Sequence, residues 1–220
     1  MIYRIAKLIS IVAHPLFILF YMLSILLMSN PYLFGMQDRH HVILLLITTF
    51  MLTTFFPGLS IILMRVLGLV ESLHMKSRHE RTGPLIVTAI FYLWLYINIK
   101  DNTNIPGAFT FVVFGTVIAV FLSFFINIFQ KISLHGVGMG GFLFGIFIIA
   151  SKFSYGSFLI EFPLLGVYQV SMILILALVF LITGMVLSSR LLLGIHTRQE
   201  IFGGLFIGMF SQFFALMLVT

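Results

Sequence analysis

The sequence contains no cysteine and few charged side chains. Without cysteine there is neither a disulfide framework nor thiolate chemistry. Only 8% of the 220 residues are charged, whereas a soluble globular domain carries roughly 25%. The chain therefore lacks the polar surface that a water-soluble domain needs, and this lack predicts an integral membrane protein.

Most of the uncharged residues are apolar. They make up 61% of the chain, and the mean hydropathy is +1.20. Lipid offers no partner to backbone polar groups, so a membrane span must be a helix or part of a closed barrel. Barrel strands would alternate apolar and polar residues, and the long apolar runs here do not. We therefore expect an all-α fold, a polytopic transmembrane helical bundle that forms one integral membrane domain over residues 1–220.

A span needs about 20 apolar residues, and seven runs suit this length. The third and fifth are short, so the count is six if one of them does not cross. Pro15 and Pro57 interrupt two runs and predict local bends. The first run follows Arg4 and Lys7 like a signal peptide, but it exceeds the roughly 7–15 apolar residues of one, which predicts a retained helix. The expected helices cover residues 8–28, 42–64, 85–99, 108–129, 137–151, 164–187 and 201–219.

The formal net charge of +6 comes from cations in the short connections between apolar runs. This placement is typical of residues that flank a membrane or bind phosphate, and it argues against a nucleic-acid partner. Most of the unusual polar residues lie in connections that we expect on one side of the membrane, with the N-terminus. These connections are 65–84, 130–136 and 188–200.

Two of these connections carry weak signals for anion binding. Lys76, Arg78 and Arg81 form a basic cluster before a predicted helix, and arginine matches phosphate oxygens bidentately. A solvated loop near lipid head groups would have the same composition. Ser133 and His135 lie where a helix begins, so a hydroxyl, an imidazole and free backbone N–H groups are available to one anion. Simple solvation of the histidine is the alternative there.

The third connection is more informative. His196 and Glu200 are four residues apart, so on a helix the carboxylate can orient the imidazole as in a catalytic triad. Arg190 lies six residues before His196 and joins it only if the chain bends, for which Gly194 is the predicted position. A helix-flanking ion pair is the alternative interpretation.

Together the three connections resemble the signatures of the type 2 phosphatidic acid phosphatase and vanadium haloperoxidase superfamily, over roughly residues 71–204. The family patterns are Lys-x6-Arg-Pro, Pro-Ser-Gly-His and Ser-Arg-x5-His-x3-Asp. The third is matched at every spacing, with Glu200 in place of Asp. The second keeps Ser133 and His135 without the proline and glycine. In the first, Lys76 takes the lysine position and Arg81 substitutes for an arginine that is missing at Gly83.

The resemblance implies a membrane phosphatase that acts on a lipid phosphate or diphosphate without a metal or cofactor. His196 would attack phosphorus and form a phosphohistidine, Glu200 would hold its tautomer, and His135 would serve as general acid and base. The substrate's hydrocarbon chain would stay in the surrounding lipid. The phosphate oxygens would be held by Lys76, Arg81, Ser133 and Arg190.

Two alternatives stay open from the sequence. One is a non-catalytic transporter, channel or lipid-binding protein, which polar residues midway through the spans would favour; Asn127 and Gln169 are the main examples. The other is a family member that binds phosphate without turnover. Neither the particular lipid nor the oligomeric state follows from the sequence.

The expected location is the cytoplasmic (inner) membrane of a bacterium. Lysines and arginines are more frequent on the side of the candidate site, which by the positive-inside rule would face the cytoplasm. Members of the resembled family usually face the other way, and several of these cations would be kept for phosphate. We therefore expect the site on the extracytoplasmic side.

Overall fold

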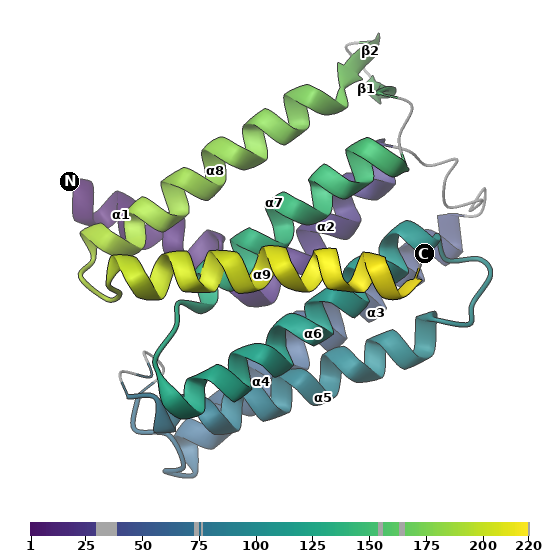
Figure 1. The fold of residues 1–220 in the computed structure, drawn as a ribbon. Coiled ribbons are helices and arrows are strands. Elements are labelled where there is room, and N and C mark those ends of the chain that lie inside the picture. Colours follow the sequence, from purple (N-terminus) through teal and green to yellow (C-terminus); the bar gives the residue numbers. More distant parts are fainter. Residues whose placement is uncertain (30–38, 73–74, 76, 154–155, 163–165, 220) are drawn as a thin grey trace.

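The structure is a computed structural model that describes residues 1–29, 39–72, 75, 77–153, 156–162 and 166–219. Its helices run up and down in one bundle (Figure 1). A π-helical segment, Met51–Phe55, joins α3 to α4, and a short 3-10 turn, His79–Arg81, leads into α5. The helices are α1 Ile2–Val12, α2 Pro15–Ser29, α3 Arg39–Phe50, α4 Phe56–Val66, α5 Thr82–Ile99, α6 Gly107–Phe129, α7 Leu134–Lys152, α8 Met172–Leu192 and α9 Arg198–Val219.

The bundle has the dimensions of a membrane domain. Six of the described helical stretches are long and apolar enough to cross a membrane, and the count is seven if α1 and α2 together form one bent span. Large apolar side chains face outward, among them Phe180 on α8 and Phe206 on α9, which are 65% and 68% exposed. Lipid is the solvent that suits such a surface. The expected all-α transmembrane bundle of six to seven helices is confirmed.

The two prolines affect their helices differently. The first predicted run is two helices, α1 and α2, which meet at 65° just before Pro15. A proline lacks the N–H that would continue the helix, so the predicted bend lies at this break. Pro57 follows the π-helical segment, and the helical path continues from Arg39 to Val66 without a break.

The predicted helix over 164–187 is wrong at its beginning. Strands β1, Ser157–Phe162, and β2, Gly166–Ser171, form an antiparallel hairpin in which Ser157 pairs with Ser171. The β-branched and aromatic residues of β2 favour extended backbone, and α8 begins only at Met172, capped by the Ser171 hydroxyl. Gln169 is exposed in this hairpin and donates to Ser157 Oγ at 2.9 Å. It is therefore not a polar residue within a span.

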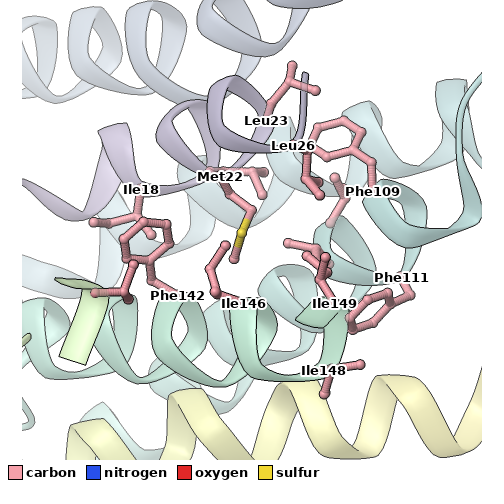
Figure 2. Close-up of a cluster of buried hydrophobic side chains, with 14 of the residues drawn as sticks. Ile18, Met22, Leu23, Leu26, Phe109, Phe111, Phe142, Ile146, Ile148 and Ile149 are labelled. Atoms are coloured by element: carbon pink, nitrogen blue, oxygen red, sulfur yellow. The ribbon is translucent and has the colours of Figure 1, made fainter. Parts of the chain in front are cut away.

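The largest buried cluster fills the part of the bundle where α2, α6 and α7 meet (Figure 2). Leu23, Phe109 and Ile146 are each 0% exposed. This part of the bundle is therefore densely packed. Figure 2 also shows Met22 beside Phe142 and Ile146, at the edge of this cluster.

Helices α7 and α9 approach each other through glycines spaced four residues apart. Gly136 and Gly140 lie on α7, and Gly204 and Gly208 lie on α9. A Cβ atom on Gly140 would lie 2.1 Å from the Leu205 carbonyl oxygen, and one on Gly208 would lie 2.1 Å from that of Val137. Such small-residue spacing is typical of close helix pairs in membranes. We call this contact the glycine seam. Because His135 precedes Gly136 and Glu200 lies in the first turn of α9, the glycine seam places the beginnings of α7 and α9 side by side.

Candidate active site

The three polar connections meet at one end of the bundle, where α1, the end of α8 and the beginning of α9 lie together (Figure 1). A cavity of about 980 Å³ opens among them. Of the predicted site residues, it brings together Arg81, His135, Arg190 and His196. Lys76 lies outside the described residues. The chemical roles of all these side chains stay predictions.

The turn between α8 and α9 presents His196 to the cavity. Gly194, where the sequence predicts a bend, has a φ of +64°, a conformation that costs glycine little. His196 is 8% exposed, and its Nδ1 lies 2.5 Å from Glu200 Oε2. Glu200 belongs to the first turn of α9, where the helix dipole favours a carboxylate. Because Nδ1–H is donated to Glu200, Nε2 carries the free lone pair and is the nitrogen available for attack.

The charge state of His196 follows from its surroundings. Burial lowers the pKa of the imidazole below its ordinary value, and the hydrogen bond that the ring donates to Glu200 opposes this effect. The nearby charges of Arg81 and Arg190 lower the pKa further. His196 is therefore neutral near pH 7, which is the form that a nucleophile requires.

Two arginines, the buried Arg81 and the half-buried Arg190, give the cavity positive charge. Arg81, 5% exposed, donates from Nε to the Met75 carbonyl at 3.1 Å and from Nη1 to that of Ile132 at 2.8 Å. Arg190 has a buried Nε without a hydrogen-bond partner within the described chain. Among the described residues, neither arginine forms an ion pair with a carboxylate. The described lining includes Lys7, Arg81, Lys131 and Arg190 but no aspartate or glutamate.

His135 and Arg190 are both held by α1, a contribution that the sequence interpretation missed. The His135 Nε2–H donates to the Ser10 carbonyl at 2.9 Å, and Arg190 Nη1 donates to Ser10 Oγ at 2.5 Å. His135 Nδ1 is therefore the nitrogen left to exchange a proton. Lys7 and His14 also line the cavity. The signal was present in the sequence, because Lys7, Ser10 and His14 are spaced by three and four residues, a spacing that places side chains on one face of a continuous helix.

Ser133 is placed differently from the other predicted residues. It is fully buried and is not among the described residues that line the cavity. Its hydroxyl caps α7 by accepting from Gly136 N–H at 3.2 Å, and its own N–H donates to the Glu200 carbonyl at 3.0 Å. Ser133 thus joins the beginnings of α7 and α9. Within the described ranges, no three His, Asp or Glu side chains come close enough to share a metal ion.

The chain matches no protein-family model, no curated protein and no solved structure. Its function must therefore be argued from the geometry of this cavity.

Proposed function

We propose that this protein is a membrane phosphatase that hydrolyses a lipid phosphate or diphosphate through a phosphohistidine on His196. One observation carries the proposal: a histidine oriented by a carboxylate lies on a cavity whose described lining contains four cations and no acid. We place the enzyme in a bacterial inner membrane with this cavity on the extracytoplasmic side. The family that the three connections resemble uses the same types of side chain.

In the first step, the lone pair of His196 Nε2 forms a bond to phosphorus while the bond to the leaving oxygen breaks. Glu200 stabilises the positive charge that develops on the imidazole. Arg81 and Arg190 hold the nonbridging oxygens, where negative charge is concentrated. The leaving oxygen takes a proton from Nδ1 of His135, so this mechanism requires His135 to be protonated when the substrate is bound. The product is a lipid alcohol, or a lipid monophosphate if the substrate was a diphosphate.

In the second step, a water oxygen attacks phosphorus and the phosphorus–nitrogen bond breaks. The electron pair returns to His196 Nε2, and the water proton passes to His135. Inorganic phosphate leaves, and both histidines regain their starting states. Lys7 and Lys131 line the same cavity, so they provide further positive charge at its mouth when the substrate enters.

One observation favours transport or lipid binding as a second candidate. Gln212 lies in the interior of α9, is 1% exposed, and lines the same cavity. Transporters place polar sites near the bilayer midplane. The dense packing around Leu23, Phe109 and Ile146 argues against a path through the bundle. We therefore rank this candidate second.

The test is phosphate release by the purified full-length protein from a panel of lipid phosphates and diphosphates in excess chelator. We expect release from at least one lipid, and its loss by at least 10³-fold in His196→Ala. His79→Ala is the matched control, because His79 is exposed and near the same loop, and it should keep normal turnover. Absence of release from every lipid, or equal turnover in both variants, would contradict the proposal.

A further inference from the structure

The cavity extends from the cationic mouth deep into the membrane part of the bundle. Its inner walls come from α2, α5, α6, α7 and α9. Leu19, Met22, Val112 and Phe142 line it there, and all four are at most 5% exposed. One continuous space therefore has cations at its mouth and an apolar interior. We call this inner part the chamber.

Three side chains meet at the inner end of the chamber, and we call this end the floor. A Cβ atom on Gly145 would lie 2.7 Å from Met22 Cε, 3.8 Å from Val112 Cγ2 and 3.9 Å from Gln212 Cδ, so these three side chains meet at one place. Met22 lies against the packed cluster of α2, α6 and α7 (Figure 2). The chamber is therefore closed at this end.

Gln212 gives the floor a polar group that lacks a partner. Its Nε2 donates to the Val112 carbonyl at 3.2 Å and contacts Thr116 Oγ1 at 3.4 Å. The opposite orientation of the amide would bring its oxygen against the Val112 carbonyl, so the observed orientation is the favourable one. Oε1 is buried without a hydrogen-bond partner in the described structure.

The space for the Gln212 side chain is provided by missing side chains on neighbouring helices. A Cβ atom on Gly115 of α6 would lie 2.5 Å from Gln212 Oε1. A Cβ atom on Gly141 of α7 would lie 3.7 Å from Gln212 Nε2. The side chain is thus fitted between α6 and α7.

The depth of the floor follows from helix geometry. Gln212 lies 14 residues after Arg198, the first residue of α9, and a rise of 1.5 Å per residue places it about 21 Å along the helix. Half of the hydrocarbon core is about 15 Å thick. Gln212 therefore lies at or beyond the level that the end of an ordinary acyl chain reaches from the head-group side.

We propose that the chamber binds the hydrocarbon chain of the lipid phosphate, and that Gln212 and Met22 set the longest chain that fits. The inference rests on the proposed function. The cationic mouth selects an anionic head, and the apolar walls select a hydrocarbon chain attached to it. A chain that presses against the unpaired Oε1 excludes any water that could hydrogen-bond to it, which costs free energy. Longer chains are therefore disfavoured, and the chain lies inside the protein instead of in the surrounding lipid.

Photocrosslinking tests the location of the chain without turnover. The probe is a lipid phosphonate with a diazirine at the chain end, which cannot be hydrolysed because a P–C bond replaces the ester. The control probe has the same chain on a neutral glycerol head. We expect the phosphonate to label peptides that contain Met22, Val112 or Gln212, and the neutral probe to label outward residues such as Phe206 and Phe210. Labelling of outward residues alone by both probes would overturn the inference.

Substrate profiles test the chain limit. With lipid phosphates of increasing chain length, kcat/KM should fall at least tenfold beyond a limiting length. Gln212→Ala should move this limit to longer chains, and Gly141→Leu to shorter ones. Gly141→Ala is the matched control, because its Cβ would meet neighbours only at 3.7 and 3.8 Å, and it should keep the wild-type limit.

The two proposals fail in different ways. If lipid phosphates are hydrolysed but kcat/KM depends on chain length in the same way in all variants, the chamber inference is overturned and the proposed function stands. If no lipid phosphate is hydrolysed, the proposed function fails. The crosslinking result then still decides whether an anionic lipid places its chain in the chamber.

Discussion

Glu200 accepts a short hydrogen bond from His196, and we propose that this contact orients the nucleophile. Glu200→Gln keeps an oxygen that can accept from Nδ1–H but removes the negative charge that stabilises the developing imidazolium. We expect kcat to fall by about 10²–10⁴-fold, while the affinity for inorganic phosphate as an inhibitor changes little. A kcat within threefold of wild type would show that the pair is structural.

The protonation state of His196 can be measured directly. Its pKa is lowered mainly by burial, so the neutral form should persist as the pH falls below the ordinary histidine value of about 6.5. In an NMR titration of the protein with labelled histidine, the His196 signal should change at a pH below this value. His196→Ala identifies the signal by its loss. A midpoint above 6.5 would mean that the Glu200 charge outweighs burial, and it would contradict this description of the site.

Ser10 is the residue through which α1 acts on the site. Ser10→Ala removes the acceptor of Arg190, and a lost hydrogen bond to a charged group is worth about 1.5–3 kcal/mol. We expect KM for the lipid phosphate to rise by about tenfold or more, with a smaller change in kcat. Ser10→Thr should keep the wild-type KM, because its hydroxyl can accept the same hydrogen bond. Ser60→Ala is the control, because Ser60 bonds only its own helix on an exposed surface. Equal kinetics of the two alanine variants would contradict this role.

At the scale of elements, the glycine seam between α7 and α9 determines where the two histidines lie. Gly208→Ala would force a Cβ atom against the Val137 carbonyl, whereas Gly203 has nothing within 4 Å of its Cβ position. Overpacking of this kind costs about 1–3 kcal/mol. Gly208→Ala should lower both the unfolding temperature in detergent and the turnover, and Gly203→Ala should do neither. Equal stability of the two variants would show that the seam has room to adjust.

Helices and connections differ in how well the sequence predicts them. Long apolar runs admit only helices in lipid, so α5, α6, α7 and α9 lie where they were expected, with no boundary shifted by more than three residues. The hairpin of β1 and β2 was missed because its second strand continues the apolar run of α8. In such a run, composition does not distinguish a strand from a helix end.

The candidate site was predictable where its residues are close in the sequence. Arg190, His196 and Glu200 share one connection, and their spacing indicated their geometry. Ser10 and Gln212 could not be recognised in the same way, because their importance comes from contacts with Arg190 and Val112, which lie 180 and 100 residues away. Ser133 was predicted as a phosphate ligand, and the sequence could not distinguish this role from the observed cap, because a serine at a helix start suits an anion as well as a cap.

At the scale of the whole molecule, all spans together place the candidate site at the end that holds the N-terminus (Figure 1). Because the chain has no cysteine, single cysteines can report sidedness. Ser77 lies on the site side and Asn102 on the other, and both are exposed. In intact cells, Ser77→Cys should react with a membrane-impermeant maleimide and Asn102→Cys should not. The reverse pattern would place the site in the cytoplasm.

The central claim is that His196 carries the phosphoryl group during turnover, and trapping that group tests it most directly. The protein is mixed with a lipid phosphate labelled with radioactive phosphorus and quenched in alkali, in which phosphohistidine survives. We expect label on the peptide that contains His196 and none in His196→Ala. Label on another residue, or on His196→Ala as strongly as on wild type, would contradict it.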